Sequence, residues 1–170
     1  MNDFWVFGYG SLIWRPDFPF EERVKARLSG YHRSLCVWSH VHRGTPERPG
    51  LVFGLDRGGS CVGMAFRVRP ENRDSVTDYL RRRELVTNVY HEVTLSVRLE
   101  GGPAVHALAF VVDRGHSQYA GRITVDHAAE IVARAHGQSG ANRDYVVHAL
   151  AEIRNFGLKD QWLEGVAARL

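Results

Sequence analysis

Cysteine, lysine and long apolar runs are scarce in this 170-residue sequence, and each shortage excludes a class of protein. No stretch approaches the roughly 20 apolar residues that a membrane-spanning helix needs, so we expect no membrane partner. Cys36 and Cys61 are the only cysteines. Because both lie in apolar, strand-like stretches, we expect buried free thiols and a cytoplasmic protein. The start, MNDFWVFGYGSL, also lacks the features of a secretory signal.

The pattern of charge argues against binding to nucleic acid, although the net charge is +3. Of the 22 basic residues, only Lys25 and Lys159 are lysines, and the arginines are scattered. The single run is Arg81–Arg83. Dispersed arginine is typical of a solvated surface, whereas nucleic-acid binding needs a basic stripe or patch. We therefore expect no nucleic-acid partner.

The remaining composition is that of an ordinary globular protein. Hydrophobic residues make up 44% of the chain and charged residues 24%, which argues against disorder. The length suits one domain, residues 1–170, that can bury a sizeable core.

Strands are predicted in the first two thirds of the chain, where apolar stretches alternate with glycine-rich turns. We predict a strand from Phe4 to Tyr9, a long strand from Val24 to Trp38 that bends at Gly30, a hairpin of Leu51–Leu55 and Cys61–Val68 around the turn DRGGS, and a second hairpin of Val93–Leu99 and Ala104–Val112. The strands do not alternate regularly with helices, so the pattern favours a mostly antiparallel, barrel-like sheet.

Helices are predicted after Pro70 and throughout the last third. We predict one helix with Val76, Tyr79 and Leu80 on one face, one capped by Thr124, one capped by Asn142 and ended by Gly157, and a short final helix around Trp162–Val166. Strands first and helices last indicate an α+β fold.

The segment FGYGSLIW, residues 7–14, is a glycine-rich turn that directly follows the first strand. A dinucleotide loop would need a third glycine, where Ile13 stands, and a helix, which Pro16 interrupts. A serine nucleophile would need the pattern G-x-S-x-G, which Ser11 does not have. The best remaining interpretation is a cradle of backbone N–H groups that binds a carboxylate or an oxyanion.

Such a cradle needs an acid or base, and Glu84 is the candidate. It ends the predicted helix and is followed by the apolar residues Leu85 and Val86. On residue chemistry alone, a solvated glutamate that balances Arg81–Arg83 is the favoured interpretation. A metal site at His40 and His42 is disfavoured, because no further ligand pair has a recognisable spacing.

Five blocks of the sequence resemble the ChaC-like γ-glutamylcyclotransferases, enzymes that degrade glutathione, over nearly the whole chain. The blocks are VFGYGSLIWRPDF, RGTPERPGLVFGL, GMAFRV, YLRRREL and GQSGANRDYVVHALAEIRNFGLKD, in the order of the family. The resemblance implies a small β-barrel flanked by helices. One departure is Gln138, where the family usually has proline.

The resemblance also implies the site. It places the catalytic glutamate at Glu84 and the substrate-binding loop at Tyr9, Gly10, Ser11 and Leu12, and it suggests Tyr119 near the substrate. Leu12 points to glutathione as the substrate, because the broader γ-glutamylcyclotransferases have asparagine there. The implied enzyme is a lyase without cofactor or metal.

The implied reaction is internal to glutathione: its α-amine attacks the γ-carbonyl, which closes 5-oxoproline and expels cysteinylglycine. We expect a monomer, or a weak dimer. Two alternatives remain: an enzyme for other γ-glutamyl amines or amino acids, and a non-catalytic domain that binds a γ-glutamyl ligand or a protein.

Overall fold

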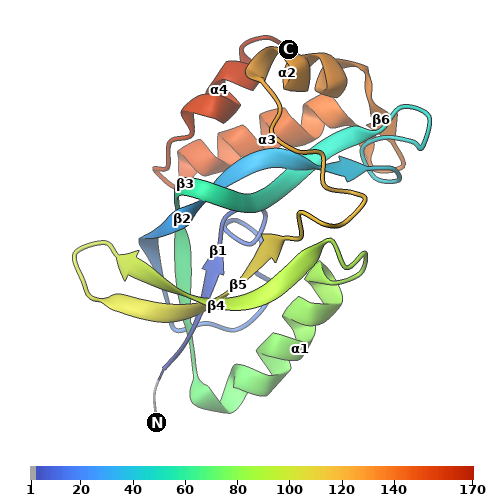
Figure 1. The fold of residues 1–170 in the computed structure, drawn as a ribbon. Coiled ribbons are helices and arrows are strands. Elements are labelled where there is room, and N and C mark those ends of the chain that lie inside the picture. Colours follow the sequence, from blue (N-terminus) through green and yellow to red (C-terminus); the bar gives the residue numbers. More distant parts are fainter. Residues whose placement is uncertain (1–2) are drawn as a thin grey trace. The chain divides into compact units, whose positions relative to one another are not determined.

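The computed structural model describes residues 3–170 and divides the chain into two compact units (Figure 1). Unit 1 contains the chain up to Arg33 together with Leu55–Asp113, and unit 2 contains Ser34–Gly54 and Arg114–Leu170. Neither unit is a continuous segment, because the chain passes from one to the other within two long strands. That the whole chain behaves as one domain stays a prediction.

Unit 1 is built on a closed five-stranded barrel with the strand order β1-β3-β2-β4-β5. Strands β1 and β5 are parallel, whereas the pairs β1–β3, β2–β4 and β4–β5 are antiparallel. The predicted mostly antiparallel barrel is therefore confirmed. The strands are β1 (Phe4–Gly8), β2 (Glu22–Ser39), β3 (Gly50–Val68), β4 (Tyr90–Leu99) and β5 (Ala104–Val112), of which β2 and β3 continue into unit 2.

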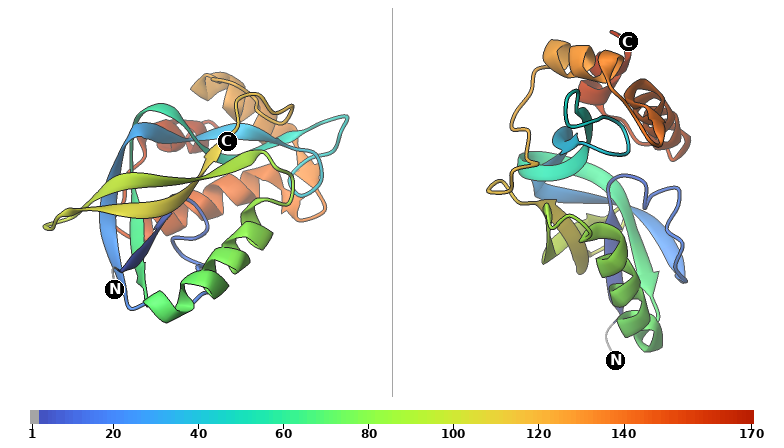
Figure 2. Two further views of the ribbon diagram at one scale, coloured as in Figure 1. Left: turned by 60° about the horizontal axis from the view of Figure 1, so that its bottom comes forward. Right: turned by 90° about the vertical axis from the view of Figure 1, so that its right-hand side faces the viewer.

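Two predictions for the strands are confirmed. Strand β2 is a single strand of 18 residues, and Gly30 within it has a φ of +93°, as the predicted bend requires. Strands β4 and β5 form the second hairpin (Figure 2). Its register runs from Tyr90 opposite Val112 to Arg98 opposite Ala104.

The predicted first hairpin is wrong, because β3 runs through the DRGGS segment as one strand of 19 residues. Gly58 and Gly59 have φ values of +100° and +67°, which L side chains rarely adopt. A glycine pair suits a tight turn, but it equally suits a local distortion inside a continuing strand. Here the glycines take up such a distortion, and the strand goes on to pair with β1.

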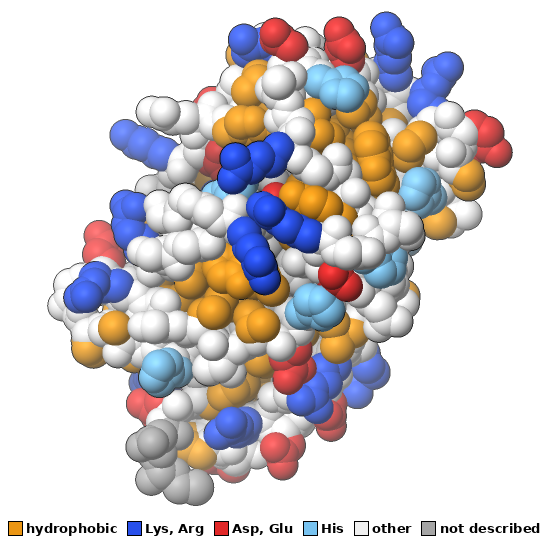
Figure 3. All heavy atoms as spheres, in the orientation of Figure 1, with side chains coloured by type: hydrophobic (Ala, Val, Ile, Leu, Met, Phe, Trp, Pro, Cys, Tyr) orange, Lys and Arg blue, Asp and Glu red, His pale blue; other side chains and the backbone are white. Residues whose placement is uncertain are grey.

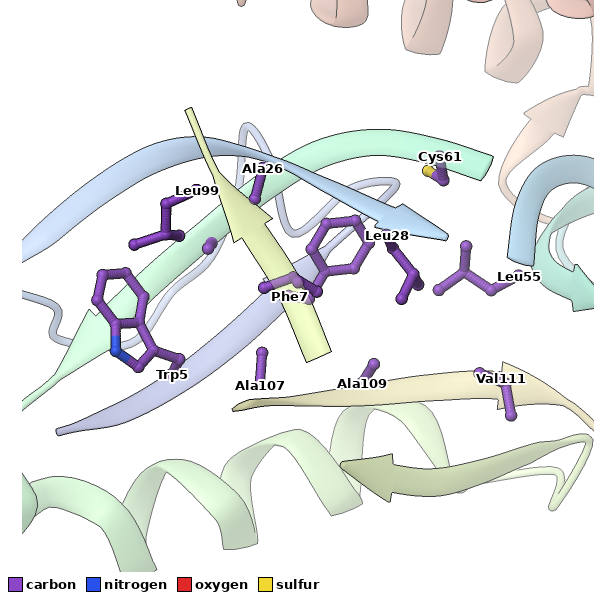
Figure 4. Close-up of a cluster of buried hydrophobic side chains, with 12 residues drawn as sticks. Trp5, Phe7, Ala26, Leu28, Leu55, Cys61, Leu99, Ala107, Ala109 and Val111 are labelled. Atoms are coloured by element: carbon purple, nitrogen blue, oxygen red, sulfur yellow. The ribbon is translucent and has the colours of Figure 1, made fainter. Parts of the chain in front are cut away.

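Side chains from all five strands fill the interior of the barrel (Figure 4). Trp5 and Phe7 point inward from alternate positions of β1, as a pleated strand requires. Burial of one large aromatic side chain such as Phe7 contributes about 2–3 kcal/mol. Cys61 belongs to this core, and Cys36 is buried as well, as predicted; neither forms a disulfide.

Helix α1 (Arg73–Glu84) lies outside the barrel and follows a short 3-10 turn, η1 (Pro70–Asn72) (Figures 1 and 2). Its residues Val76 and Leu80 are buried, at the spacing of one helical turn. Four aromatic rings pack together where this helix and the segment that follows β1 contact β3. They are Phe18, Phe20, Phe66 and Tyr79, with ring centroids 5.1–6.5 Å apart in the contacting pairs.

Unit 2 contains three helices that pack against one another: α2 (Val125–Arg134), α3 (Asn142–Asn155) and α4 (Gln161–Ala167). A two-stranded ribbon, β6 (His136–Gly137) and β7 (Gly140–Ala141), precedes α3. The predicted cap of α2 is confirmed, because the Thr124 side chain accepts a hydrogen bond from the His127 N–H at 3.2 Å. Gly157, with a φ of +73°, follows the end of α3 as predicted.

None of the helices in residues 3–170 is long and apolar enough to cross a membrane.

Arginine side chains at several scattered positions are paired with carboxylates, among them Arg67 with Glu22 at 2.8 Å and Arg81 with Glu92 at 2.7 Å. On the face in Figure 3, basic, acidic and hydrophobic side chains are interspersed. The positive charge at the paired positions is thus offset by its neighbours.

The predicted capping role of Asn142 is wrong. The residue is completely buried, and its side chain makes no capping hydrogen bond. Instead its amide oxygen accepts from the Leu51 N–H at 2.8 Å, and its amide nitrogen donates to the Leu51 carbonyl at 2.9 Å. Asn142 therefore satisfies both backbone groups of one residue in β3, and it ties the start of α3 to that strand.

Replacing Asn142 by alanine is expected to destabilise the protein by about 2–4 kcal/mol, because two buried backbone groups of Leu51 would lose their partner. The free energy of unfolding from urea titrations measures the loss. Asn142→Asp should be at least as destabilising at neutral pH, because a buried carboxylate oxygen would face the Leu51 carbonyl oxygen. A change under 0.5 kcal/mol in Asn142→Ala would contradict this account.

Candidate active site

Strand β1 leads directly into a single tight turn at residues 9–14. The Ile13 N–H donates to the Gly10 carbonyl at 2.9 Å, and the Arg15 N–H donates to the Ser11 carbonyl at 2.8 Å. Leu12 and Ile13 are buried, with 5% and 0% of their surface exposed. The turn is thus held by two backbone bonds and by two apolar anchors.

Glycine is required where β3 passes the end of β1. A Cβ atom on Gly63 would lie 2.3 Å from the Gly8 carbonyl oxygen, and one on Gly8 would lie 3.0 Å from the Leu12 Cβ. Real Cβ atoms essentially never show a contact as short as the first, and the second is tighter than nine in ten real Cβ contacts. Close contact of β1, β3 and the turn therefore depends on the missing side chains of Gly8 and Gly63.

The turn presents unused hydrogen-bond donors. Within residues 3–170, the amide N–H groups of Gly10, Ser11 and Leu12 donate to no other group of the protein. Successive N–H groups in a turn form a concavity that suits an anion or a developing negative charge. Since the Leu12 side chain is buried, this residue can offer a ligand its N–H, and the leucine side chain serves as an anchor.

Arg33 of β2 supports the turn and was not anticipated from the sequence. Only 6% of its surface is exposed. Its Nε donates to the Tyr9 carbonyl at 2.6 Å, and one terminal nitrogen donates to the Val62 carbonyl at 2.8 Å. The guanidinium thus joins the start of the turn to β3. Because these contacts link residues far apart in the sequence, no local sequence pattern predicts them.

Glu84 is the last residue of α1, and 18% of its side chain is exposed. Burial raises the pKa of this carboxyl above its ordinary value, and the positive charge of Arg83 lowers the pKa by a smaller amount. Of the two apolar residues that follow Glu84, Leu85 is half-buried, whereas Val86 is 77% exposed and does not cover the carboxyl group. A carboxyl group with a raised pKa is suited to accept and return a proton near neutral pH.

The three arginines before Glu84 have different surroundings. Arg81 pairs with Glu92 of β4, and Arg82 is exposed. Arg83 donates to the Ser11 hydroxyl at 2.9 Å, and its Nε lies 3.8 Å from a carboxylate oxygen of Glu84. Unit 1 thus brings together the predicted site residues Ser11 and Glu84, with Arg83 between them.

Tyr119 belongs to unit 2, where its position can be described by itself. It is half-buried and forms a β-bridge with Val37, and the Arg114 guanidinium lies 5.7 Å from the centre of its ring. Its predicted place near the substrate stays a prediction.

Gln138, the position that departs from the family's proline, lies between β6 and β7. Its N–H donates to the Val41 carbonyl at 2.8 Å, a bond that proline could not make. The neighbouring Ser139 hydroxyl lies 3.0 Å from Nδ1 of His42.

Across residues 3–170, no group of three or more His, Cys, Asp or Glu side chains is arranged to hold a metal ion.

Comparison with known proteins identifies the family. The sequence profile of the ChaC-like proteins matches residues 4–169, which is nearly the whole chain. The chain belongs to the ChaC-like family. One ChaC-like relative, the glutathione-specific γ-glutamylcyclotransferase of Escherichia coli K12, is 33% identical over 159 residues, which cover 94% of this chain and 69% of the relative.

A second ChaC-like relative, glutathione-specific γ-glutamylcyclotransferase 1 of Danio rerio, is 32% identical over 94% of this chain and 83% of its own length. Among solved structures, the chain is similar to a yeast γ-glutamyl cyclotransferase specific to glutathione. That similarity has a TM-score of 0.84 at 23% identity and covers 99% of this chain and 97% of the yeast chain. The yeast structure supports the same fold.

The raised pKa of Glu84 predicts how Glu84→Gln changes stability. Because the folded protein holds the proton more tightly than the unfolded chain, ionised Glu84 destabilises the fold. The stability of the wild type relative to Glu84→Gln should therefore fall as the pH rises from the unfolded pKa through the folded pKa. Above that range Glu84→Gln should be the more stable protein, which urea titrations at pH 4 to 8 would measure.

Glu92→Gln is the matched control, because the pKa of Glu92 is shifted in the opposite direction from the pKa of Glu84. The hydrogen bond from Arg81 lowers the pKa of Glu92, so its ionised form stabilises the fold. Glu92→Gln should be less stable than the wild type at neutral pH, and the difference should disappear as the pH falls through the pKa of Glu92. Identical pH dependence in the two variants would contradict the assignment for Glu84.

Proposed function

We propose that this protein is a glutathione-specific γ-glutamylcyclotransferase, a lyase that converts glutathione into 5-oxoproline and cysteinylglycine. Glu84 is its general base and acid, and the turn with Tyr9, Gly10, Ser11 and Leu12 binds the γ-glutamyl group. The observation that carries the proposal is the largely buried carboxyl of Glu84, joined through Arg83 to a turn with three unused N–H donors. The names of the ChaC-like relatives supply the substrate.

The reaction takes place within one substrate molecule. The α-amine of the γ-glutamyl group attacks its own γ-carbonyl carbon, a new C–N bond closes the five-membered ring, and the bond from that carbon to the cysteine nitrogen breaks. The proton that leaves the attacking amine goes to the leaving amine. A well-oriented intramolecular reaction gains up to about 7–11 kcal/mol over its bimolecular counterpart, so the main task of the site is to hold the reacting conformer.

Proton transfer explains the environment of Glu84. An ordinary glutamate with a pKa of ~4.3 that takes a proton from an amine of ~8 faces a gap of ~3.7 units, or roughly 5 kcal/mol. Burial of Glu84 raises its pKa and narrows the gap. The same group can then protonate the leaving amine, and such acid–base catalysis contributes about 10²–10⁴-fold in rate.

The turn offers hydrogen-bond donors for the negative charge that develops on the γ-carbonyl oxygen. When the amine attacks, the γ-carbonyl oxygen becomes an oxyanion. The N–H groups of Gly10, Ser11 and Leu12 would face it, and one donor of this kind contributes on the order of 10²-fold or more. In this mechanism Ser11 helps to form the turn and to bind the substrate, and the substrate's own amine is the nucleophile.

Several finer points belong to the same proposal. Tyr119 contacts the substrate, no cofactor or metal takes part, and the protein acts as a cytoplasmic monomer or weak dimer without nucleic-acid or membrane partners. The alternatives are a cyclotransferase for other γ-glutamyl amines or amino acids and a non-catalytic binding domain. Substrate assays separate the three.

Purified protein incubated with glutathione should release 5-oxoproline, detected by mass spectrometry, and γ-glutamylalanine should be a much poorer substrate. Glu84→Gln should lower the rate by about 10²–10⁴-fold, because the proton has no acceptor. The variant should still bind glutathione in calorimetry. Normal turnover in Glu84→Gln would refute the role of Glu84, and binding without 5-oxoproline in the wild type would favour the non-catalytic alternative.

Ser11→Ala should fold normally and keep measurable activity, because the backbone donors of the turn remain. The rate of 5-oxoproline release and thermal unfolding together test this expectation. Complete loss of activity in a folded Ser11→Ala protein would revive a nucleophilic role for the hydroxyl.

A further inference from the structure

We propose that Arg83 is a positioning residue of the active site: its guanidinium holds the turn that follows β1 in register with the carboxylate of Glu84. The proposal rests on the function proposed above and adds a residue to it. The contacts that carry it all lie within unit 1.

The guanidinium of Arg83 donates to four oxygen atoms around it. One terminal nitrogen donates to the Ser11 hydroxyl at 2.9 Å. The other shares its two N–H groups among three acceptors, the carbonyls of Arg15 and Pro16 at 2.7 and 3.2 Å and the Tyr79 hydroxyl at 3.0 Å. Only 16% of the side chain is exposed. Arg83 thus joins the last turn of α1 to the middle of the turn after β1 and to the two residues that follow that turn.

This arrangement requires arginine. The guanidinium is planar and directs its N–H groups in a fixed fork, so it can bind several acceptors in one plane at once. A lysine ammonium is a single point of charge on a flexible stem and would satisfy fewer of these acceptors. The guanidinium of Arg83 therefore fixes the segment 11–16 in addition to supplying a positive charge.

Arg83 also leaves the carboxylate of Glu84 available. The 3.8 Å separation of Arg83 Nε from Glu84 Oε1 is an ion-pair contact and is too long for a hydrogen bond. Within residues 3–170, the Glu84 carboxylate accepts no hydrogen bond from the protein. The terminal nitrogens of Arg83 donate to Ser11, Tyr79 and the carbonyls of residues 15 and 16, and the carboxylate of Glu84 keeps its lone pairs for a proton.

The charge of Arg83 next to Glu84 predicts a change in the pH dependence of activity, which a purely structural role of Arg83 would not produce. Arg83 is the charged group within ion-pair distance of Glu84 among the described residues; Arg81 pairs with Glu92 of β4, and Arg82 is exposed. The charge of Arg83 opposes the effect of burial on the pKa of Glu84. Removing that charge should raise this pKa further, and the acid limb of the activity profile should move to higher pH.

Two variants at position 83 separate geometry from charge. Arg83→Lys keeps the charge but loses the fork, and it should lower kcat/KM for glutathione by about 10²-fold, the effect of a small misplacement of reacting groups. Its acid limb should stay close to that of the wild type. Arg83→Met removes both, and it should lower kcat/KM at least as far and also move the acid limb to higher pH.

Arg81→Lys is the matched control. Arg81 lies on the same helix and donates two hydrogen bonds to Glu92, at 2.7 and 2.9 Å, but both residues are at the surface. This variant should keep kcat/KM within twofold of the wild type. Equal losses in Arg81→Lys and Arg83→Lys would reveal a general effect on α1 and would overturn the proposal, as would full activity of Arg83→Lys or an unmoved acid limb in Arg83→Met.

A measurement without turnover keeps the test independent of the proposed function. The Ile13 and Arg15 N–H groups close the turn by bonds to Gly10 and Ser11. Their hydrogen exchange, followed by NMR, should be at least tenfold faster in Arg83→Lys than in the wild type or Arg81→Lys. Unchanged exchange would overturn the positioning role. If the wild type releases no 5-oxoproline while exchange changes as expected, the proposed function fails and the role of Arg83 in holding the turn stands.

Discussion

The close passage of β3 across the end of β1 is the constraint on which the site depends. With no side chain at Gly63, β3 comes so near the Gly8 carbonyl that any Cβ atom there would overlap it. This contact fixes where β1 ends. The chain must then turn at once, Leu12 and Ile13 enter the core, and Arg33 holds the Tyr9 carbonyl from β2. The unused N–H donors of the turn thus depend on the packing of its neighbours.

The environment of Glu84 balances two opposed effects. Burial disfavours its charged form and Arg83 favours it, and burial is the stronger. Full burial without Arg83 would leave a group that seldom ionises, whereas full exposure would leave an ordinary surface glutamate. The cost falls on stability, because the folded protein holds a carboxylate where a neutral side chain would fit better. Shifted pKa values of this kind are common at functional sites.

Local signals explain which features could be predicted from the sequence. The alternation of β4 and β5 and the cap at Thr124 involve residues close together in the chain, and both are confirmed. The pair Gly58–Gly59 fits two local geometries, a tight turn and a distortion within a strand, so the hairpin predicted at DRGGS differs from the continuous strand of the structure. Contacts over long separations leave no local pattern: Arg33 meets Tyr9 at a separation of 24 residues and Arg83 meets Ser11 at 72. The family resemblance points to Glu84 as a candidate, whereas the contact of Arg83 with Ser11 can be seen only in the structure.

The order of the barrel strands has a consequence for how the chain folds. Strand β1 pairs with β3 and, in parallel, with β5, so Trp5 finds its partner Ala107 only after most of the chain has been made. Pairings between such distant residues slow folding, because the entropy of closing a long loop is lost before the contact forms. On the ribosome, the first strand and the turn that follows it must therefore wait for β5 before the barrel can close.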